Sequence, residues 1–117
     1  MGLFTHHHAP AMSPAEAFEA LAGSAVLVDV REPDEWAAGH APQAVHVPLA
    51  SVAASASGLP TGVPVVVICR SGRRSDAAAI ELRRSGIDAI NLTGGMQAWQ
   101  QAGGSVVRDD GQPGSVI

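Results

Sequence analysis

Apolar residues along this chain gather in four short runs, at residues 25–30, 44–47, 65–68 and 87–92, with more polar segments between them. The first and third runs are apolar nearly throughout and do not alternate with polar residues. That pattern is typical of strands buried on both faces, as in a parallel sheet. Residues 65–68 form the most strongly apolar run, so we predict that they are the central strand.

Helix signals lie between these runs. Ser13 and Glu16 form a capping-box pattern around Pro14, a residue that suits the first helical position, and Gly23 follows as a stop signal. Acidic residues in a first turn favour a short helix that opens at residues 31–36.

Further helices are predicted in the second half of the chain. The longest covers residues 73–84 and ends before Gly86, and another covers residues 96–102. Residues 49–57 are mostly small and give a weaker helical signal. The core-facing side of the longest helix is predicted to consist of Ala77, Ala78, Ile80 and Leu82.

Strands and helices therefore alternate, with short connections between them. This order predicts an α/β fold with a mostly parallel sheet and helices on both faces. A chain of 117 residues has room for one ordinary core. We predict a single domain over residues 1–117, with its core at about 13–103, an N-terminal segment at 1–12 and a polar tail at 104–117 that is mobile or lies along the surface.

The composition excludes several classes of function. Hydrophobic residues make up 46% of the chain and charged residues 15%, which is incompatible with a wholly disordered chain. The net charge of −4 and the scarcity of aromatic residues argue against a nucleic-acid partner. All seven basic residues are arginine, so Schiff-base chemistry on a lysine is excluded. No apolar run could span a bilayer and the first ten residues lack signal-peptide features, so we expect a soluble, cytoplasmic protein without a membrane partner.

Cys69 is the only cysteine. An intramolecular disulfide and a cysteine-rich zinc site are therefore excluded, and a cytoplasmic location would keep the thiol reduced. Three adjacent histidines, His6 to His8, could bind a metal weakly, although a solvated or short edge segment is the simpler interpretation. We expect neither a cofactor nor a metal at the reacting centre.

The position of Cys69 makes it the candidate nucleophile. It directly follows the predicted central strand, and open parallel sheets bind ligands at the carboxyl ends of their strands. Four features of the next segment favour a thiolate: a helix N-terminus, the guanidinium groups of Arg70, Arg73 and Arg74, the backbone N–H groups of a turning loop, and the conformational freedom of Gly72. The thiolate is the nucleophilic form of cysteine, and an inert buried cysteine would not need so basic a context.

Residues 69–75, which read Cys-Arg-Ser-Gly-Arg-Arg-Ser, resemble the active-site loop of the single-domain rhodaneses. Two other segments, one before the loop and one near the C-terminus, resemble further signatures of that family. The resemblance covers roughly residues 13–103, and one departure is Gln43, where the family usually has glycine in a local turn. The two signatures comprise Val28 to Arg31, Glu35, Trp36, Gly39, His40 and Pro48, and then Asn91 to Met96, Ala98 and Trp99.

The resemblance implies a rhodanese-like, five-stranded, mostly parallel sheet and sulfur transfer through a cysteine persulfide. Cys69 would take the outer sulfur of thiosulfate, and cyanide or an external thiol would then accept it in a ping-pong reaction. Arg70 and Arg74 match basic positions of the family, whereas Arg73 matches a variable one. The substrate-binding residues that the resemblance implies are Arg70, Ser71, Gly72, Arg73, Arg74 and Ser75.

Other polar residues are expected to support the site. Ser71 and Ser75 can cap the following helix or stiffen the loop by hydrogen bonds. Arg31 is expected to pair with Glu35, and Asp29 to brace a neighbouring loop. Turn-forming or packing roles are expected for His40, Trp36 and Trp99.

Three alternatives stay open. A phosphatase or arsenate reductase would need five residues between its cysteine and arginine, whereas four separate Cys69 from Arg74. A rhodanese-like binding module often lacks the cysteine that is present here. A persulfide carrier that serves a protein partner would use the same chemistry as an enzyme with a small acceptor. Because there is no second cysteine, the sulfur acceptor must come from outside the chain.

Overall fold

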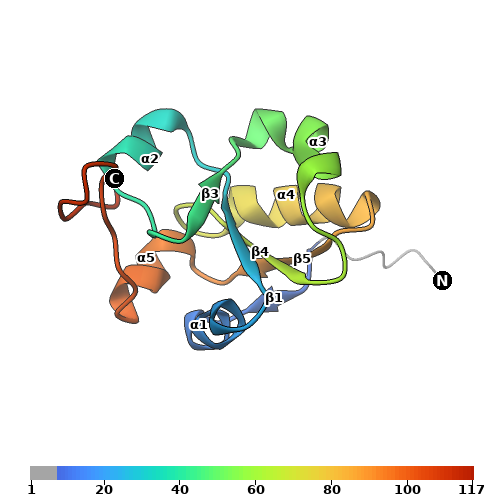
Figure 1. Cartoon of the computed structure of the whole chain (residues 1–117), viewed down its shortest axis with the longest axis horizontal. Coiled ribbons are helices and arrows are strands. Elements are labelled where there is room, and N and C mark those ends of the chain that lie inside the picture. Colours follow the sequence, from blue (N-terminus) through green and yellow to red (C-terminus); the bar gives the residue numbers. More distant parts are fainter. Residues whose placement is uncertain (1–7) are drawn as a thin grey trace.

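The computed structural model describes residues 8–117, in which strands and helices alternate (Figure 1). The strands are β1 (Ala11–Met12), β2 (Val26–Asp29), β3 (Ala44–His46), β4 (Pro64–Ile68) and β5 (Asp88–Leu92). The α-helices are α1 (Pro14–Ala22), α2 (Pro33–Ala38), α3 (Val52–Ser55), α4 (Arg73–Arg84) and α5 (Gly95–Gln101). Two 3-10 turns, η2 (Leu49–Ser51) and η3 (Ala56–Gly58), flank α3, so the weak helical stretch is divided into three short pieces.

The five strands form one sheet in the order β1-β5-β4-β2-β3, and every pair is parallel. β4 is the middle strand, with Val26 of β2 on one side of Val65 and Ala89 of β5 on the other. The prediction of an α/β fold with residues 65–68 at its centre is therefore confirmed. The carboxyl end of β4 consequently lies at the middle of the sheet edge, between the ends of β2 and β5.

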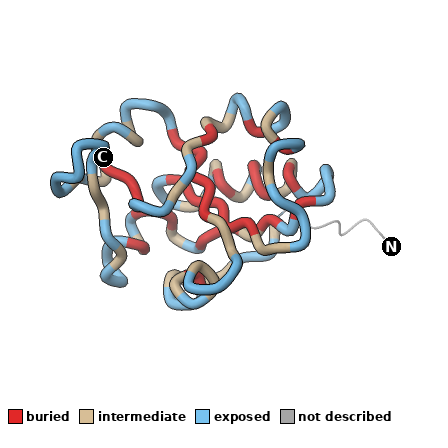
Figure 2. The backbone as a smooth tube through the Cα atoms, in the orientation of Figure 1, coloured by how far each residue is buried: buried red, intermediate tan, exposed pale blue. Residues whose placement is uncertain are grey.

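Alternate residues of β4 face opposite sides of the sheet and divide the core into two layers. Val65, Val67 and Cys69 belong to the layer covered by α3 and α4, whereas Val66 and Ile68 belong to the layer covered by α1 and α5. Figure 2 shows the buried backbone running through the strands and the inner sides of these helices. The alternation places the Cys69 side chain on the same face as α4, the helix that follows it.

β1 is the strand that the hydrophobic pattern did not indicate. It has only two residues and lies at the edge of the sheet, where Ala11 and Met12 pair with Asn91 and Leu92 of β5. A two-residue strand leaves no periodic signal in a sequence. The interpretation of the N-terminal segment as a short edge element holds for these residues, whereas His6 and His7 lie outside the described residues.

The helix boundaries agree with the predictions at α1 and α4 and differ at α2. Ser13 and Glu16 form the expected capping box, with hydrogen bonds of 3.1 and 2.8 Å. α2 begins at Pro33 instead of at residue 31, because Glu32 occupies the N-cap.

The predicted inner face of α4 was right at Ala78 and Leu82 and wrong at Ala77, and Ile80 is only half-buried and lines a surface hollow. Ala77 is exposed, and Ala79 is buried in its place. The buried positions follow the spacing i, i+3, i+4, i+7 that a helix produces when it packs on a sheet. These positions are Ser75, Ala78, Ala79 and Leu82.

Residues 104–117 lie along the surface beside α2. Val107 forms two backbone hydrogen bonds with His40, of 2.8 and 2.9 Å, and the Ser115 N–H donates to the Ala38 carbonyl at 2.9 Å. The tail is thus held by backbone hydrogen bonds, in agreement with the surface-lying arrangement expected. Within residues 8–117, none of the helices has both the length and the apolar character needed to cross a membrane.

Candidate active site

Cys69 directly follows β4 and is almost fully covered, with 1% of the residue exposed. Its neighbours Arg70 and Ser71 are exposed and form the outer rim of the loop.

The loop turns back over the sulfur between β4 and α4. Gly72 is the N-cap of α4 and has φ of 108°, a left-handed conformation that favours glycine. In this conformation the Gly72 N–H donates to Cys69 Sγ at 3.1 Å. Ser75 lies in the first turn of α4, and its hydroxyl oxygen is 3.3 Å from the same sulfur. Gly72 is the N-cap, so the capping role expected of Ser71 or Ser75 was wrong, whereas the Ser75 hydroxyl forms hydrogen bonds of the loop-stiffening kind that was the other expectation.

The environment lowers the pKa of the Cys69 thiol. Burial by itself raises this pKa, but hydrogen bonds from the Ser75 hydroxyl and from the backbone N–H groups of Ser75, Gly72 and Ser71 together outweigh it. These donors stabilise the negative charge of the thiolate. The inward-facing N–H groups that we expected from the turning loop are therefore present, and they contribute directly to the ionisation of the thiol.

The N-terminus of α5 holds the other side of the loop. The Met96 N–H donates to the Cys69 carbonyl at 2.8 Å, and the Gln97 N–H donates to the Arg70 carbonyl at 3.1 Å. A Cβ atom at Gly95 would lie 2.5 Å from the Cys69 carbonyl oxygen, so only glycine allows this approach. Gly95, the first residue of α5, thus serves the active-site loop, a role that the local pattern of a turn does not reveal.

The three loop arginines have different surroundings. Arg74 forms two hydrogen bonds with Glu35 of α2, at 2.6 and 2.8 Å. These bonds lower the pKa of Glu35 to about 2, against the opposing effect of burial, and they are the main cause of the raised pKa of Arg74. The negative charge of the Cys69 thiolate contributes to the same rise.

Arg70 and Arg73 are exposed, and in the described part of the chain neither has an ion-pair partner. Arg73 lines a small hollow beside the N-terminal segment, together with Gly72, Asp76 and Asn91. It therefore extends toward a different side of the loop from Arg74, whose partner lies on α2.

The expected pairing of Arg31 with Glu35 was wrong. Arg31 instead pairs with Asp29 through contacts of 2.8 to 3.1 Å, and it also donates to the Gly39 carbonyl at 2.7 Å. Both side chains of the pair are completely buried. Asp29 consequently neutralises Arg31, and its Oδ1 also accepts from the Arg31 backbone N–H at 3.0 Å. Glu35 pairs instead with Arg74.

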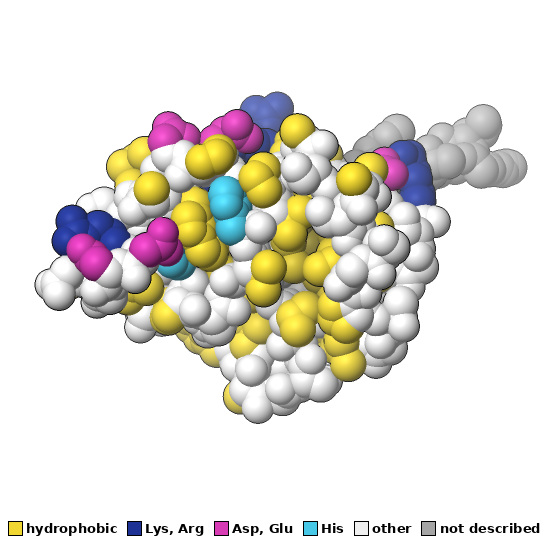
Figure 3. Space-filling model, turned by 45° about the horizontal axis from the view of Figure 1, so that its top comes forward, with side chains coloured by type: hydrophobic (Ala, Val, Ile, Leu, Met, Phe, Trp, Pro, Cys, Tyr) yellow, Lys and Arg dark blue, Asp and Glu magenta, His cyan; other side chains and the backbone are white. Residues whose placement is uncertain are grey.

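His40 and Trp36 are packing residues beside the site. Their rings stack with centroids 3.6 Å apart, and His46 stacks at 4.8 Å from Trp36. His40 Nδ1 also contacts the Trp36 carbonyl at 2.8 Å, which agrees with a structural role for this histidine. Figure 3 shows a face on which histidine and apolar side chains occupy the middle while acidic and arginine side chains lie toward the rim. Trp99 is buried against α1, as expected of a core residue.

Asn91 is a polar residue of the site whose role the sequence did not indicate. It lies near the end of β5, with 9% of the residue exposed. Its amide nitrogen donates to the Gly72 carbonyl at 3.0 Å, and its carbonyl oxygen accepts from the Ser75 hydroxyl at 2.6 Å. In the sequence, Asn91 was identified only as the first residue of a family signature, without a role in the site.

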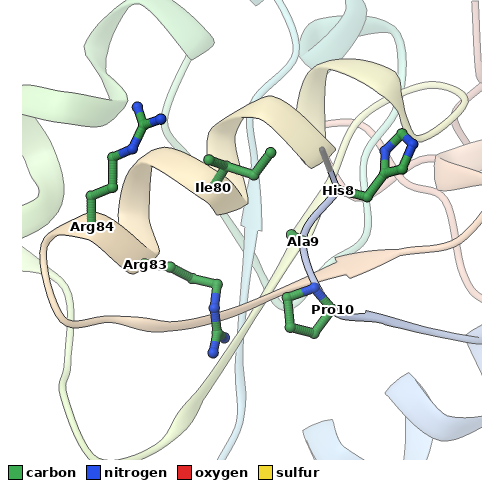
Figure 4. Close-up of a pocket in the computed structure, with 6 residues that line it drawn as sticks. All are labelled: His8, Ala9, Pro10, Ile80, Arg83 and Arg84. Atoms are coloured by element: carbon green, nitrogen blue, oxygen red, sulfur yellow. The ribbon is translucent and has the colours of Figure 1, made fainter. Parts of the chain in front are cut away.

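A larger hollow of about 740 Å³ lies away from Cys69, between the N-terminal segment and the C-terminal half of α4. Arg83 and Arg84, two residues that line it, point to opposite sides of the helix, so their charges do not converge on one ligand (Figure 4). His8 lies at its edge and contacts Asp76 at 2.8 Å. Of the three adjacent histidines, this is the one that the structure describes.

The central strand of this parallel α/β sheet leads directly to Cys69. Hydrogen-bond donors from the following loop and the first turn of α4 surround the sulfur, an arrangement typical of proteins that use a cysteine thiolate. The family described as "Rhodanese-like domain" matches residues 13–102 of the chain. The chain belongs to the rhodanese-like domain family.

Solved structures agree with this assignment. A rhodanese-related protein from Thermoplasma volcanium is 28% identical, with a TM-score of 0.77 over 84% of this chain and 97% of its own. A human single-domain sulfurtransferase is also 28% identical, with a TM-score of 0.73 over 80% of this chain and 96% of its own. A rhodanese homologue from the bacterium Thermus thermophilus is 32% identical, with a TM-score of 0.64 over 76% and 99% of the two chains. The family and the sulfurtransferase neighbour support sulfur transfer as the general kind of chemistry.

Proposed function

We propose that this protein is a thiosulfate sulfurtransferase that carries sulfur as a persulfide on Cys69. The observation that carries the proposal is the ring of donors around Cys69 Sγ, in which the Gly72 N–H at 3.1 Å and the Ser75 hydroxyl at 3.3 Å help to lower the pKa of the thiol. A buried sulfur that serves only packing needs no such donors. The same donors suit a cysteine sulfur that alternates between a free thiolate and a persulfide.

In the first step, the Cys69 thiolate attacks the outer sulfur of thiosulfate. The sulfur–sulfur bond of thiosulfate breaks, and its electron pair leaves with sulfite, which carries two negative charges. A new bond joins Cys69 Sγ to the transferred sulfur, and the single negative charge of the thiolate now lies on that outer sulfur. The total charge is the same on both sides of the step, so no proton or external electron is required.

In the second step, cyanide or a thiolate attacks the outer sulfur of the persulfide. The bond to Cys69 Sγ breaks, its electrons return to Sγ, and thiocyanate or a new persulfide leaves. Cys69 is the only cysteine of the chain, so a resolving thiol has to be supplied by the acceptor. This requirement is compatible with a small acceptor and with a thiol on a protein partner.

A kinetic experiment tests the proposed sequence of steps. We expect initial rates of thiocyanate formation, measured at several concentrations of thiosulfate and cyanide, to give parallel lines in a double-reciprocal plot, because sulfite leaves before cyanide reacts. Lines that intersect would mean that both substrates are bound before any product leaves. That result would contradict a free persulfide intermediate.

Arg74 is expected to bind the donor, because a dianion must approach an anionic thiolate and the charge of Arg74, in the first turn of α4, can offset that repulsion. Replacing Arg74 by alanine removes the charge-assisted hydrogen bond that it would donate to thiosulfate, and it leaves the Glu35 carboxylate without its partner. We expect the KM for thiosulfate to rise about ten- to a hundredfold. The matched control is Arg73→Ala, which removes the same charge from the adjacent residue on another side of the loop and should change KM less. An equal or larger effect of Arg73→Ala would contradict this assignment.

Glu35 is expected to restrain Arg74 and to repel anionic donors. In Glu35→Gln the carboxylate charge is lost while an oxygen remains to accept from Arg74, so we expect a decrease in KM for thiosulfate of about two- to fivefold at low salt. The double variant Arg74→Ala/Glu35→Gln should have a lower KM than Arg74→Ala alone. Steady-state kinetics at two salt concentrations measures both effects. A rise in KM in Glu35→Gln would show that Glu35 mainly positions Arg74 for the substrate.

A further inference from the structure

The Ser75 hydroxyl lies between two acceptors and has one proton to donate. Its oxygen is 2.6 Å from Asn91 Oδ1 and 3.3 Å from Cys69 Sγ. A hydroxyl group donates a single full hydrogen bond, although it can accept others. Asn91 and the sulfur therefore compete for the same proton.

The contacts of Asn91 fix the orientation of its amide group. The Gly72 carbonyl can only accept, so the Asn91 atom that lies 3.0 Å from it must be the donor Nδ2. The oxygen Oδ1 then faces Ser75, and an amide oxygen can only accept. The Ser75 hydroxyl therefore donates its proton to Asn91 Oδ1, at 2.6 Å, whenever Cys69 is a neutral thiol. In that state the S–H group can donate to the free lone pairs of the Ser75 oxygen.

Ionisation of Cys69 changes this balance. A thiolate is a charged acceptor, and charge-assisted hydrogen bonds are stronger than neutral ones. The Ser75 hydroxyl then turns its proton toward Sγ, and Asn91 Oδ1 loses its donor. Once sulfur has been transferred, the charge lies on the outer sulfur and Sγ is neutral. The Ser75 proton is then free to return to Asn91.

We propose that Asn91 is a positioning residue that competes with Cys69 for the Ser75 proton, yields it to the free thiolate and recovers it when the sulfur is loaded. The return of the Ser75 proton to Asn91 after sulfur transfer rests on the proposed persulfide function. The competition between Asn91 and Cys69 for that proton does not. Asn91 thereby opposes formation of the free thiolate and favours the loaded state. It acts through Ser75 and does not touch the reacting sulfur.

The loop does not depend on Asn91 for its shape. The Asp76 N–H also donates to the Gly72 carbonyl, at 3.3 Å, and α5 holds the Cys69 and Arg70 carbonyls through backbone N–H groups at 2.8 and 3.1 Å. Loss of the Asn91 side chain therefore leaves the loop anchored on two sides. The main consequence of that loss is that the Ser75 proton has no competing acceptor.

The charged or titratable groups around the loop are Arg70 of the loop itself, Arg73, Arg74 and Asp76 of α4, Glu35 of α2, Asp29 and Arg31 at the end of β2, and His8 of the N-terminal segment. Arg73, Asp76 and His8 line the same hollow as Asn91, but within the described residues the Asn91 side chain hydrogen-bonds only to Ser75 and Gly72, and Asn91→Leu neither adds nor removes a charge. Arg74 of α4 pairs with Glu35 of α2, and Asp29 pairs with Arg31. α5 carries no charged residue, and the charged residue of β5, Asp88, lies at the opposite end of that strand. A change in the reactivity of Cys69 in an Asn91 variant thus reports on the Ser75 proton.

The test measures alkylation of Cys69 by iodoacetamide, which follows the thiolate fraction and requires no sulfur donor. In Asn91→Leu the competing oxygen is absent, so we expect alkylation about three- to tenfold faster than in the wild type near pH 6, and an equal rate near pH 10, where both thiols are ionised. The same substitution in a Ser75→Ala background should leave the rate unchanged. If the leucine variant does not fold, Asn91→Ala removes the same oxygen and takes its place.

A second variant separates competition from a merely structural role. Asn91→Asp keeps an acceptor oxygen and adds a negative charge, so alkylation near pH 6 should become slower than in the wild type. Opposite effects of leucine and aspartate support the proposal. Slower alkylation in both variants, or an equal effect of Asn91→Leu with and without the Ser75 hydroxyl, would overturn it. Failure of the proposed function would appear separately, as normal alkylation without any sulfur uptake from thiosulfate.

Discussion

Replacing Cys69 by serine is expected to reduce thiocyanate formation from thiosulfate and cyanide to the background rate. The thiolate is the proposed nucleophile, and the loop donors lower the pKa of the thiol. A serine hydroxyl is not ionised by these groups near neutral pH, and an oxygen atom cannot carry the transferred sulfur as a persulfide. The assay is colorimetric detection of thiocyanate at saturating concentrations of both substrates.

The control for this variant is its folding. Cys69 is almost fully buried, so thermal unfolding of Cys69→Ser should be compared with that of the wild type. Ser71→Ala provides a matched change at an exposed position of the same loop and should retain most of the activity. Thiocyanate formation by a folded Cys69→Ser variant at a rate well above background would refute the covalent mechanism.

Replacing Arg31 by alanine is expected to lower the free energy of unfolding by about 3 to 5 kcal/mol. The change leaves the Asp29 carboxylate in a fully buried position without the partner that now contacts it at 2.8 Å. An unpaired buried charge costs this much, whereas removal of both charges costs less. Urea denaturation measures the loss, and it should be accompanied by an unchanged KM for thiosulfate per folded molecule.

The double variant Asp29→Asn/Arg31→Ala distinguishes a charge effect from a loss of packing. If the unpaired carboxylate causes the destabilisation, the double variant should be more stable than Arg31→Ala alone. If the double variant is as unstable as the single one, the missing arginine side chain has mainly left a cavity, and the buried ion pair contributes little.

The central part of the fold was predictable because the strands around the site are buried on both faces. Residues 65–68 are apolar throughout, which placed them at the centre of a parallel sheet and placed Cys69 at its carboxyl edge. β1 was not predictable in the same way, because two residues cannot show a period. The inner face of α4 was misjudged at Ala77 and Ala79, since a run of three alanines gives no contrast between the two sides of a helix.

The composition of the candidate site was predictable only where its residues are neighbours in the sequence. Cys69, Gly72 and Ser75 lie within seven consecutive residues, in the loop and the first turn of α4, and their proximity follows from the chain itself. Arg74 and Glu35 are 39 residues apart, so their pairing depends on how α2 and α4 are placed above the sheet. Asn91 belongs to the neighbouring strand, and its contact with Ser75 depends on the parallel pairing of β4 with β5.

The Arg31 pairing shows how a local rule can mislead. A spacing of four residues favours Arg31 and Glu35 as partners on a helix, but Arg31 precedes α2 and still follows the extended backbone of β2. Residues two apart in an extended segment lie on the same side, which brings Arg31 to Asp29.

Mass spectrometry of the intact protein after brief treatment with thiosulfate tests the central claim most directly. We expect the wild type to gain the mass of one sulfur atom, the peptide that contains Cys69 to carry it, and cyanide to remove it with release of thiocyanate. The Cys69→Ser variant should show no gain under the same conditions. A folded wild-type protein that gains no sulfur from thiosulfate, or that gains it at a site other than Cys69, would contradict the proposed function.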